Sequence, residues 1–203
     1  MITKLNFAGD HRARLIRAPR APLAWRLKNT LRPAFIAGRL AFWAARLFSR
    51  LTGIPTLTAQ LSIRVLKANG AVIDYGVVGC RVITTAFVNY LVDSLQSTQA
   101  DWVNFKYHDS GVGTTAENVA DTGIETTDGE SRATGTQTEG ASANIYKSVG
   151  TINYTTTKAI TEHGLFNATT AGTLMDRTVF SAINVVNGDS IEHTYQLTVN
   201  SGG

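Results

Sequence analysis

Hydrophobic residues between Leu23 and Leu51 recur at the spacing of a helix. The large apolar positions are separated by steps of mostly three or four residues: Leu27, Leu31, Phe35, Ile36, Leu40, Trp43, Leu47 and Leu51. This spacing predicts an amphipathic helix of roughly five turns. Pro33 is expected in a first turn or at a kink, and Gly53 followed by Pro55 is typical of a helix end.

After Pro55 the hydrophobic pattern changes from helical spacing to alternation. Residues 61–65 and 72–77 alternate between apolar and other side chains, and Asn69-Gly70 lies in the turn between them. An Asn-Gly turn between two alternating runs predicts a β-hairpin. A second helix is expected next, capped by Thr84 or Thr85, with an apolar face made of Phe87, Val88, Leu91, Val92 and Leu95.

The second half of the chain predicts strands and turns. A strand is expected to contain Trp102, Phe105 and Tyr107, and residues 108–140 are expected to form long surface loops with one or two short strands. Longer strands follow at about residues 142–154, 158–166, 173–186 and 189–200, the last alternating through Ile191, His193, Tyr195, Leu197 and Val199. Strands separated by turns at this spacing are typical of a sandwich. We therefore predict a mainly β fold, an antiparallel β-sandwich of jelly-roll-like type with one packed helix.

Positive charge is concentrated at the start of the chain. Residues 1–67 contain thirteen of the nineteen lysines and arginines and a single acid, Asp10, which gives them a net charge of +12. Residues 68–203 contain the other six basic residues and fourteen acids, which gives −8. We divide the chain into a basic N-terminal arm (residues 1–60), which carries the amphipathic helix, and a β-sandwich domain (residues 61–203). Prolines before Leu23 predict that the arm begins as an extended tail, and its charge predicts an acidic partner.

Two features of the sequence argue against a disulfide, a cysteine-based zinc site and a membrane span. Cys80 is the only cysteine, so the chain forms no internal disulfide and no cysteine-based zinc site. The apolar stretch at residues 34–48 is interrupted by Arg39 and Arg46 and is shorter than the ~20 residues that a membrane span requires. We therefore expect no stable membrane insertion, and the start of the chain does not resemble a secretory signal.

Several blocks of sequence in the second half resemble one family. They are YHDSGVGTTAE at 107–117, EGASANIY at 139–146, AITEHGLF at 159–166, DRTVF at 176–180 and VVNGDS at 185–190. In this order they resemble a family of small virion structural proteins of tailed bacteriophages, over about residues 70 to 203. The resemblance implies a location in the virion and a role as a capsid decoration or cement protein, or as part of the neck, tail or fibre. It also implies an antiparallel sandwich that forms homo-oligomers. The family has no catalytic residue that could be assigned to a position in this chain.

The basic arm favours the capsid among these locations. We expect a decoration protein whose arm binds the major capsid protein or another virion protein, since large aromatic residues and arginine are favoured at interfaces. The residues expected to bind the partner are Arg26, Leu27, Leu31, Arg32, Phe35, Arg39, Leu40, Trp43, Arg46, Leu47 and Arg50. The alternatives are a tail, neck or fibre component, a DNA-binding protein that uses the arm, and a helix at a membrane interface.

Histidines are the candidate metal ligands of this chain. His108, His163 and His193 lie on separate predicted strands, so a metal site would require their convergence over long distances. Glu162 precedes His163 directly, and neighbouring strand residues point to opposite faces. We therefore predict that the histidines form ordinary hydrogen bonds, with no metal and no cofactor.

The glycines, serines and acids of this chain also do not lie in the sequence motifs that enzymes use for catalysis. The glycines at 111 and 113 lack the lysine of a phosphate-binding loop, and Ser110 is outside a nucleophile-elbow pattern. Acids that might act as a glycosidase pair lie in the predicted loops: Asp109 with Glu117, and Asp128 with Glu130. We therefore predict that the protein is not an enzyme.

Overall fold

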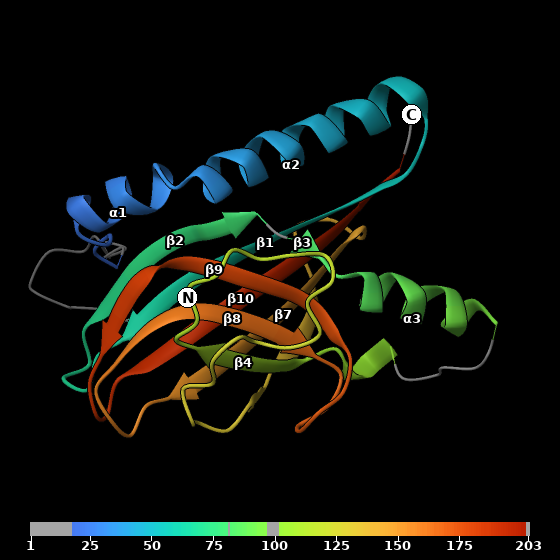
Figure 1. The fold of residues 1–203 in the computed structure, drawn as a ribbon. Coiled ribbons are helices and arrows are strands. Elements are labelled where there is room, and N and C mark those ends of the chain that lie inside the picture. Colours follow the sequence, from blue (N-terminus) through green and yellow to red (C-terminus); the bar gives the residue numbers. More distant parts are fainter. Residues whose placement is uncertain (1–17, 81, 97–101, 202–203) are drawn as a thin grey trace, which may run out of the picture.

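Two antiparallel five-stranded sheets form the body of the protein (Figure 1). The computed structural model describes residues 18–80, 82–96 and 102–201. The first sheet has the order β2 (Val72–Cys80), β1 (Thr56–Leu66), β10 (Ser190–Asn200), β7 (Ile145–Asn153) and β6 (Thr136–Glu139). The second has the order β3 (Val82–Ile83), β9 (Leu174–Val185), β8 (Lys158–Phe166), β4 (Tyr107–Gly111) and β5 (Ala133–Thr134). The predicted β-sandwich is confirmed, and the extended tail lies largely in residues 1–17, outside the described residues.

The core lies between the two sheets. Buried side chains of β1 and β10 in the first sheet pack with those of β8 and β9 in the second, among them Leu61, Ile191, Ile160 and Phe180. The alternation expected for the last strand holds from Ile191 to Leu197, while Val199 is exposed. One face of β10 is therefore buried along most of its length, as the period of two predicts.

The first hairpin forms where the sequence predicts it. β1 and β2 pair with Leu66 opposite Val72, and Gly70 in the turn has φ +80°, a conformation that glycine adopts without strain. β1 begins at Thr56, so strand residues lie on both sides of the boundary that we placed between residues 60 and 61.

Helix α3 (Thr85–Leu95) is confirmed, but its buried face differs from the prediction. The hydroxyl of Thr84 accepts the N–H of Phe87 and caps the helix. Phe87 and Tyr90 are buried and pack edge-to-face on Phe105, with ring centroids 5.1 and 4.9 Å apart. Three residues of the predicted apolar face are instead exposed: Val88, Val92 and Leu95. A further correction concerns the strand predicted around residue 102, because Trp102–Asn104 form a short 3-10 helix.

The arm contains two helices rather than one continuous helix. α1 (Leu23–Thr30) and α2 (Pro33–Thr52) are separated at Arg32, whose ψ of 129° is extended. A residue before proline avoids the helical region, and proline itself is well accommodated at the first helical position. α2 ends at Gly53, which has φ +74°. The expected roles of Pro33 and Gly53 are confirmed.

Helix α1 is attached to both sheets of the sandwich. The side-chain amide of Asn29 donates to the carbonyl of Val78 in β2 (3.0 Å) and accepts the N–H of Ser181 in β9 (2.9 Å). The indole of Trp25 donates to the carbonyls of Ser181 and Ala182, at 3.1 and 2.9 Å. Among the described residues, β9 pairs with β3 only at residues 176 and 177 on this side, so α1 covers an edge that these residues otherwise leave unpaired (Figure 1).

Candidate functional site

Helix α2 approaches the sandwich with its small residues. Gly38 faces the end of β2, where an added Cβ would lie 2.5 Å from the carbonyl oxygen of Cys80. Ser49 is buried near the other end of the helix, and its hydroxyl donates to the carbonyl of Asn200 (3.1 Å). Because this side of α2 carries small side chains, the helix lies close to β1 and β2.

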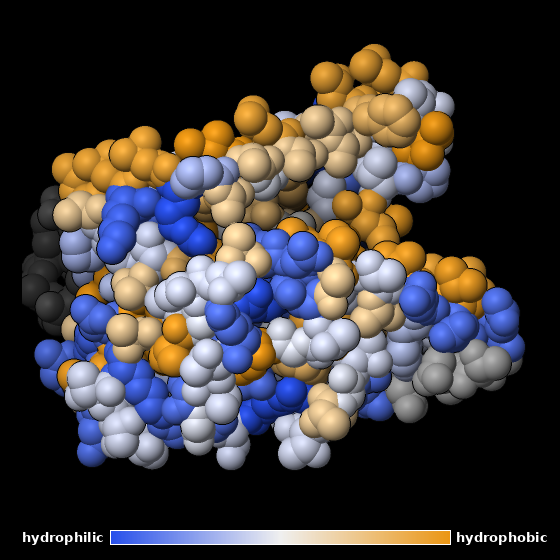
Figure 2. Space-filling view, viewed as in Figure 1, coloured by the Kyte–Doolittle hydropathy of each residue, from blue (hydrophilic) through white to orange (hydrophobic). Residues whose placement is uncertain are grey.

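The large apolar residues of both helices point away from the sandwich. Their side chains are 51% to 76% exposed, and we call them the outer ridge: Leu23, Leu27, Leu31, Leu40, Trp43, Leu47 and Leu51. Figure 2 shows apolar side chains along the outward side of α1 and α2. A contiguous apolar surface of this kind is typical of a protein or membrane contact. The outer ridge is therefore our candidate docking site.

Arginines line one side of the ridge on α2. Arg39, Arg46 and Arg50 are separated by seven and four residues, which places them along the same side of a helix. The guanidinium of Arg46 lies over the rings of Phe42 and Trp43, at 5.6 and 5.7 Å from their centroids. Residues 18–55 contain neither aspartate nor glutamate. The docking site is therefore apolar in the middle and uniformly positive at its side.

The predicted partner-binding residues divide between two sides of the helices. Those in the outer ridge are Leu27, Leu31, Leu40, Trp43 and Leu47, while Arg26, Arg39 and Arg50 are exposed and Arg46 is half-buried. Arg32 and Phe35 lie toward the sandwich. Arg32 donates to the carbonyl of Val179 (2.6 Å), and Phe35 lines a hollow beside Tyr75 of β2. These two residues hold the helices in place and do not belong to the exposed face.

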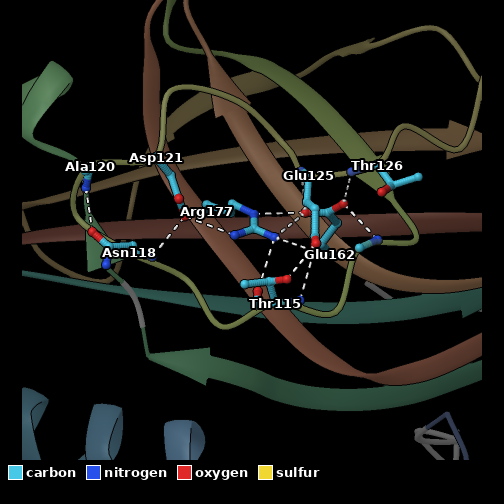
Figure 3. A network of polar contacts seen from close by, with 9 residues as sticks. Thr115, Asn118, Ala120, Asp121, Glu125, Thr126, Glu162 and Arg177 are labelled. Carbon is cyan, nitrogen blue, oxygen red and sulfur yellow. Dashed lines mark hydrogen bonds and ion pairs between the residues drawn. The ribbon is translucent and has the colours of Figure 1, made fainter.

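A buried ion-pair network occupies the centre of the second sheet (Figure 3). Arg177 of β9 pairs with Glu162 of β8 at 2.9 Å, and also with Asp121 (3.0 Å) and Glu125 (3.4 Å). Glu162 further accepts the backbone N–H groups of residues 113, 125 and 126. The three backbone hydrogen bonds of this carboxylate attach the loop between β4 and β5 to the sheet, so the network is a structural clamp.

The acids considered as catalytic candidates form similar structural contacts. Asp109 pairs with Arg132 at 2.8 Å, and Glu130 pairs with Lys158 at 2.7 Å. Ser110 hydrogen-bonds to Asp128 and to the hydroxyl of Tyr154. Desolvation raises the pKa of Asp109, whereas hydrogen bonds from Lys158 and Thr155 lower the pKa of Glu130. These pairs attach the long loop to β4 and β8.

The three histidines converge in the interior, which the sequence did not reveal. His108 Nδ1 and His163 Nε2 share a hydrogen bond of 2.9 Å, and the rings of His163 and His193 stack with centroids 4.6 Å apart. Burial lowers the pKa of His108 to about 3, and burial together with His108 lowers the pKa of His193 well below its usual value. Within the described residues, no three side chains of histidine, cysteine, aspartate or glutamate are placed to hold a metal ion.

Two comparisons with known proteins gave a negative result. A scan against models of known protein families and a search of curated proteins both find no match to the chain. In the part of the chain that the structure describes, no helix has the length and hydropathy needed to cross a membrane. The outer ridge is therefore the main structural indication of a function.

Proposed function

We propose that this protein is a non-enzymatic structural protein of a tailed-phage virion, namely a capsid decoration or cement protein. In this proposal the outer ridge binds the major capsid protein or another virion protein. The observation that carries it is a row of large apolar side chains held outward on two helices: α1 is attached to both sheets, and α2 packs on the first sheet. The ridge is thus presented by a rigid support.

The size of the ridge is sufficient for protein docking. Full burial of one large apolar side chain contributes roughly 1.5–3 kcal/mol, so burial of the ridge contributes on the order of 10 kcal/mol. Association itself costs about 4–15 kcal/mol. One chain alone is therefore expected to bind weakly or moderately, and linkage of several chains in a homo-oligomer would strengthen attachment.

The arginines contribute mainly to orientation and to the rate of association. Exposed charges at the side of an apolar interface steer an acidic partner toward it, and this effect weakens with salt. A DNA-binding role is less favoured because the most outward residues of α1 and α2 are apolar rather than basic. Phosphate contacts would require the arginines to face outward instead.

The location is tested by the abundance of the chain in particles. Particles purified from cells that produce this protein are analysed by quantitative mass spectrometry against the major capsid protein. A decoration protein is expected at a copy number comparable with that of the capsid protein. A far lower number would move the protein to the tail, neck or fibre, and its absence from particles would overturn the virion proposal.

The docking site is tested by replacing ridge residues with acids. The double variant Leu40→Glu and Leu47→Glu is expected to attach to particles that lack the chain at least about tenfold more weakly, a change equivalent to ~1.4 kcal/mol. Val186→Glu is the matched control, because Val186 is an exposed valine in the turn before β10. Equal attachment of the ridge variant and the control would remove the ridge from the interface.

A further inference from the structure

A hollow lies between α1, the start of α2 and β2. Figure 1 shows α1 and the beginning of α2 passing over β2. The hollow has a volume of about 530 Å³, and ligand-binding cavities in proteins commonly measure about 300–1,000 Å³. We call it the arginine hollow. Its large side chains are arginines and aromatic residues, namely Arg20, Arg26, Arg39, Trp25, Phe35 and Tyr75.

The aromatic walls of the arginine hollow are held in place by contacts with the sandwich. The rings of Trp25 and Tyr75 meet edge to face, with centroids 4.6 Å apart. The indole N–H of Trp25 donates to two carbonyls of β9, at 3.1 and 2.9 Å. The N–H of Ala21 donates to the carbonyl of Asp74 (2.8 Å), which attaches the segment before α1 to β2. The hollow is therefore a preformed feature of the fold.

The described part of the chain leaves the positive charge of the hollow unpaired. Arg20, Arg26 and Arg39 are exposed, and none of them forms an ion pair within residues 18–80, 82–96 and 102–201. Asp74 also lines the hollow, and its carboxylate accepts the N–H of Gly76 (2.8 Å). Three arginines and one aspartate give the lining a net charge of +2. The hollow is therefore suited to a negatively charged ligand.

We propose that the arginine hollow binds an acidic segment of the protein on which the outer ridge docks. Aspartate or glutamate side chains of that segment pair with the guanidinium groups, and its apolar atoms lie against the aromatic walls. Arginine binds a carboxylate through two parallel hydrogen bonds, which are roughly twice as strong as neutral ones. The inference rests on the proposed function, because it names the chemistry of the partner at the same docking site.

The arginine hollow and the outer ridge can contact one partner at the same time. Arg26 directly precedes the ridge residue Leu27 on α1, and Arg39 directly precedes the ridge residue Leu40 on α2. Successive residues of a helix are about 100° apart around its axis, so each arginine lies at the side of the ridge. A partner that covers the ridge therefore reaches the hollow as well.

Charge and shape argue against other occupants of the hollow. Residues 1–17 contain four basic residues and one acid, a net charge of +3 that repels them from the arginines. The helices of a second copy are excluded in the same way, because residues 18–55 contain no acid. Nucleic acid carries phosphates, but it presents no apolar side chains to the adjacent ridge. An acidic protein segment satisfies both surfaces.

Binding is measured with the full chain and a defined acidic probe. The probe is a terminally blocked hexaglutamate peptide with a neutral fluorophore, and fluorescence anisotropy at low salt gives its Kd. The double variant Arg26→Gln and Arg39→Gln is expected to raise the Kd at least about tenfold. Asp74→Asn removes the competing negative charge and keeps an oxygen for the N–H of Gly76, so it should lower the Kd.

A matched control removes the same charge outside the hollow. Lys28→Gln with Arg50→Gln also replaces one basic residue on each helix, and both residues are exposed and absent from the lining. This control should change the Kd by less than about threefold, since exposed charges at a distance are screened. Equal losses in the two double variants, or no binding of the probe by the wild type, would overturn the inference. Tighter binding of a thymidine hexanucleotide than of the peptide would assign the hollow to nucleic acid instead.

The inference and the proposed function fail in different experiments. The hollow variant should attach to particles that lack the chain more weakly than its control does, and equal attachment would overturn the inference. Loss of attachment by Leu40→Glu with Leu47→Glu would then still support the proposed function. If that ridge variant attaches like Val186→Glu while probe binding depends on the hollow, the proposed function fails and the carboxylate site stands.

A second copy of this chain is tested as the source of the acidic segment. Sedimentation velocity compares the wild type with the variant Arg26→Gln and Arg39→Gln. We expect the two to have the same oligomeric state, because the acidic segment belongs to another protein. Dissociation of wild-type oligomers by the variant would place the acidic segment on a second copy and overturn the inference.

Discussion

Gly38 in α2 lies so close to Cys80 in β2 that a Cβ at position 38 would be 2.5 Å from the Cys80 carbonyl oxygen. This contact sets the depth at which α2 packs on the first sheet. It also orients the helix, because the side that approaches the sheet must be the side without large residues. The exposure of the α2 part of the outer ridge therefore follows from the close packing of these two residues.

The first prediction concerns Gly38→Ala. Alanine favours a helix over glycine by about 1 kcal/mol, but overpacking against a backbone carbonyl typically costs about 1–3 kcal/mol. Since that carbonyl belongs to a strand, we expect a net loss of free energy of unfolding, measured by urea denaturation. Gly123→Ala is the control, because Gly123 has open space around its Cβ position and should be neutral. A stabilised Gly38→Ala protein would show that α2 packs less closely.

The second prediction concerns the attachment of α1. Asn29→Ala leaves the Val78 carbonyl and the Ser181 N–H without their partner, and a buried unsatisfied group costs about 1–3 kcal/mol. We expect the free energy of unfolding, measured by thermal denaturation, to fall by several kcal/mol. Thr30→Ala should change little, since the Thr30 hydroxyl is exposed and bonds only within its helix. If both variants unfold alike, α1 does not support the sandwich.

The third prediction concerns the buried clamp. Arg177→Met leaves Glu162 buried without its main countercharge, and breaking a buried ion pair in this way costs about 3–5 kcal/mol. The matched control is Arg64→Met, which removes the partly exposed pair with Glu192 and should cost about 1 kcal/mol or less. The free energies of unfolding of the two variants are measured by chemical denaturation at pH 7. Similar losses would indicate that the Arg177 network is solvated.

The fourth prediction is a loss of stability in acid. His108 and His193 have lowered pKa values in the folded protein, so below pH 6.5 the unfolded chain binds protons that the folded protein does not. The contribution of these two histidines to the free energy of unfolding should be fully present above pH 6.5. It should fall as the pH is lowered toward 3, by up to about 1.4 kcal/mol per pH unit for each histidine.

A variant isolates the contribution of one histidine to this slope. His193 stacks on His163, and among the described residues neither of its ring nitrogens has a hydrogen-bond partner. His193→Phe should therefore keep the fold and reduce the slope of unfolding free energy between pH 6 and pH 4. An unchanged slope would show that His193 is already protonated in the folded protein.

Local signals in the sequence predicted much of the fold. Asn69-Gly70, Pro33 and Gly53 fix backbone conformation over a few residues, so the hairpin and the limits of α2 follow from them. The buried face of α3 does not follow, because it depends on Phe105, which approaches Phe87 and Tyr90 only after the chain folds. Periodicity alone cannot distinguish which apolar side of a short helix meets such a partner.

The candidate site was predictable as a set of residues but not as a surface. Spacing placed Leu40 and Leu47 on one side of a helix, and the structure leaves that side exposed. Arg32 was grouped with them because of its charge, yet it satisfies the edge of β9. The hollow that Ala41 of α2, Leu57 of β1 and Val82 of β3 line had no signal in the sequence, since its walls come from segments that are distant along the chain.

The two hydrogen bonds of Asn29 also set an order of events during folding. Val78 and Ser181 belong to different sheets and are far apart in the chain, so Asn29 meets both only after the two sheets have joined. Long-range contacts of this kind form late because closing long loops is entropically costly. The outer ridge is therefore fixed in its outward orientation only on a completed sandwich, so the docking that we propose is restricted to chains that have finished folding.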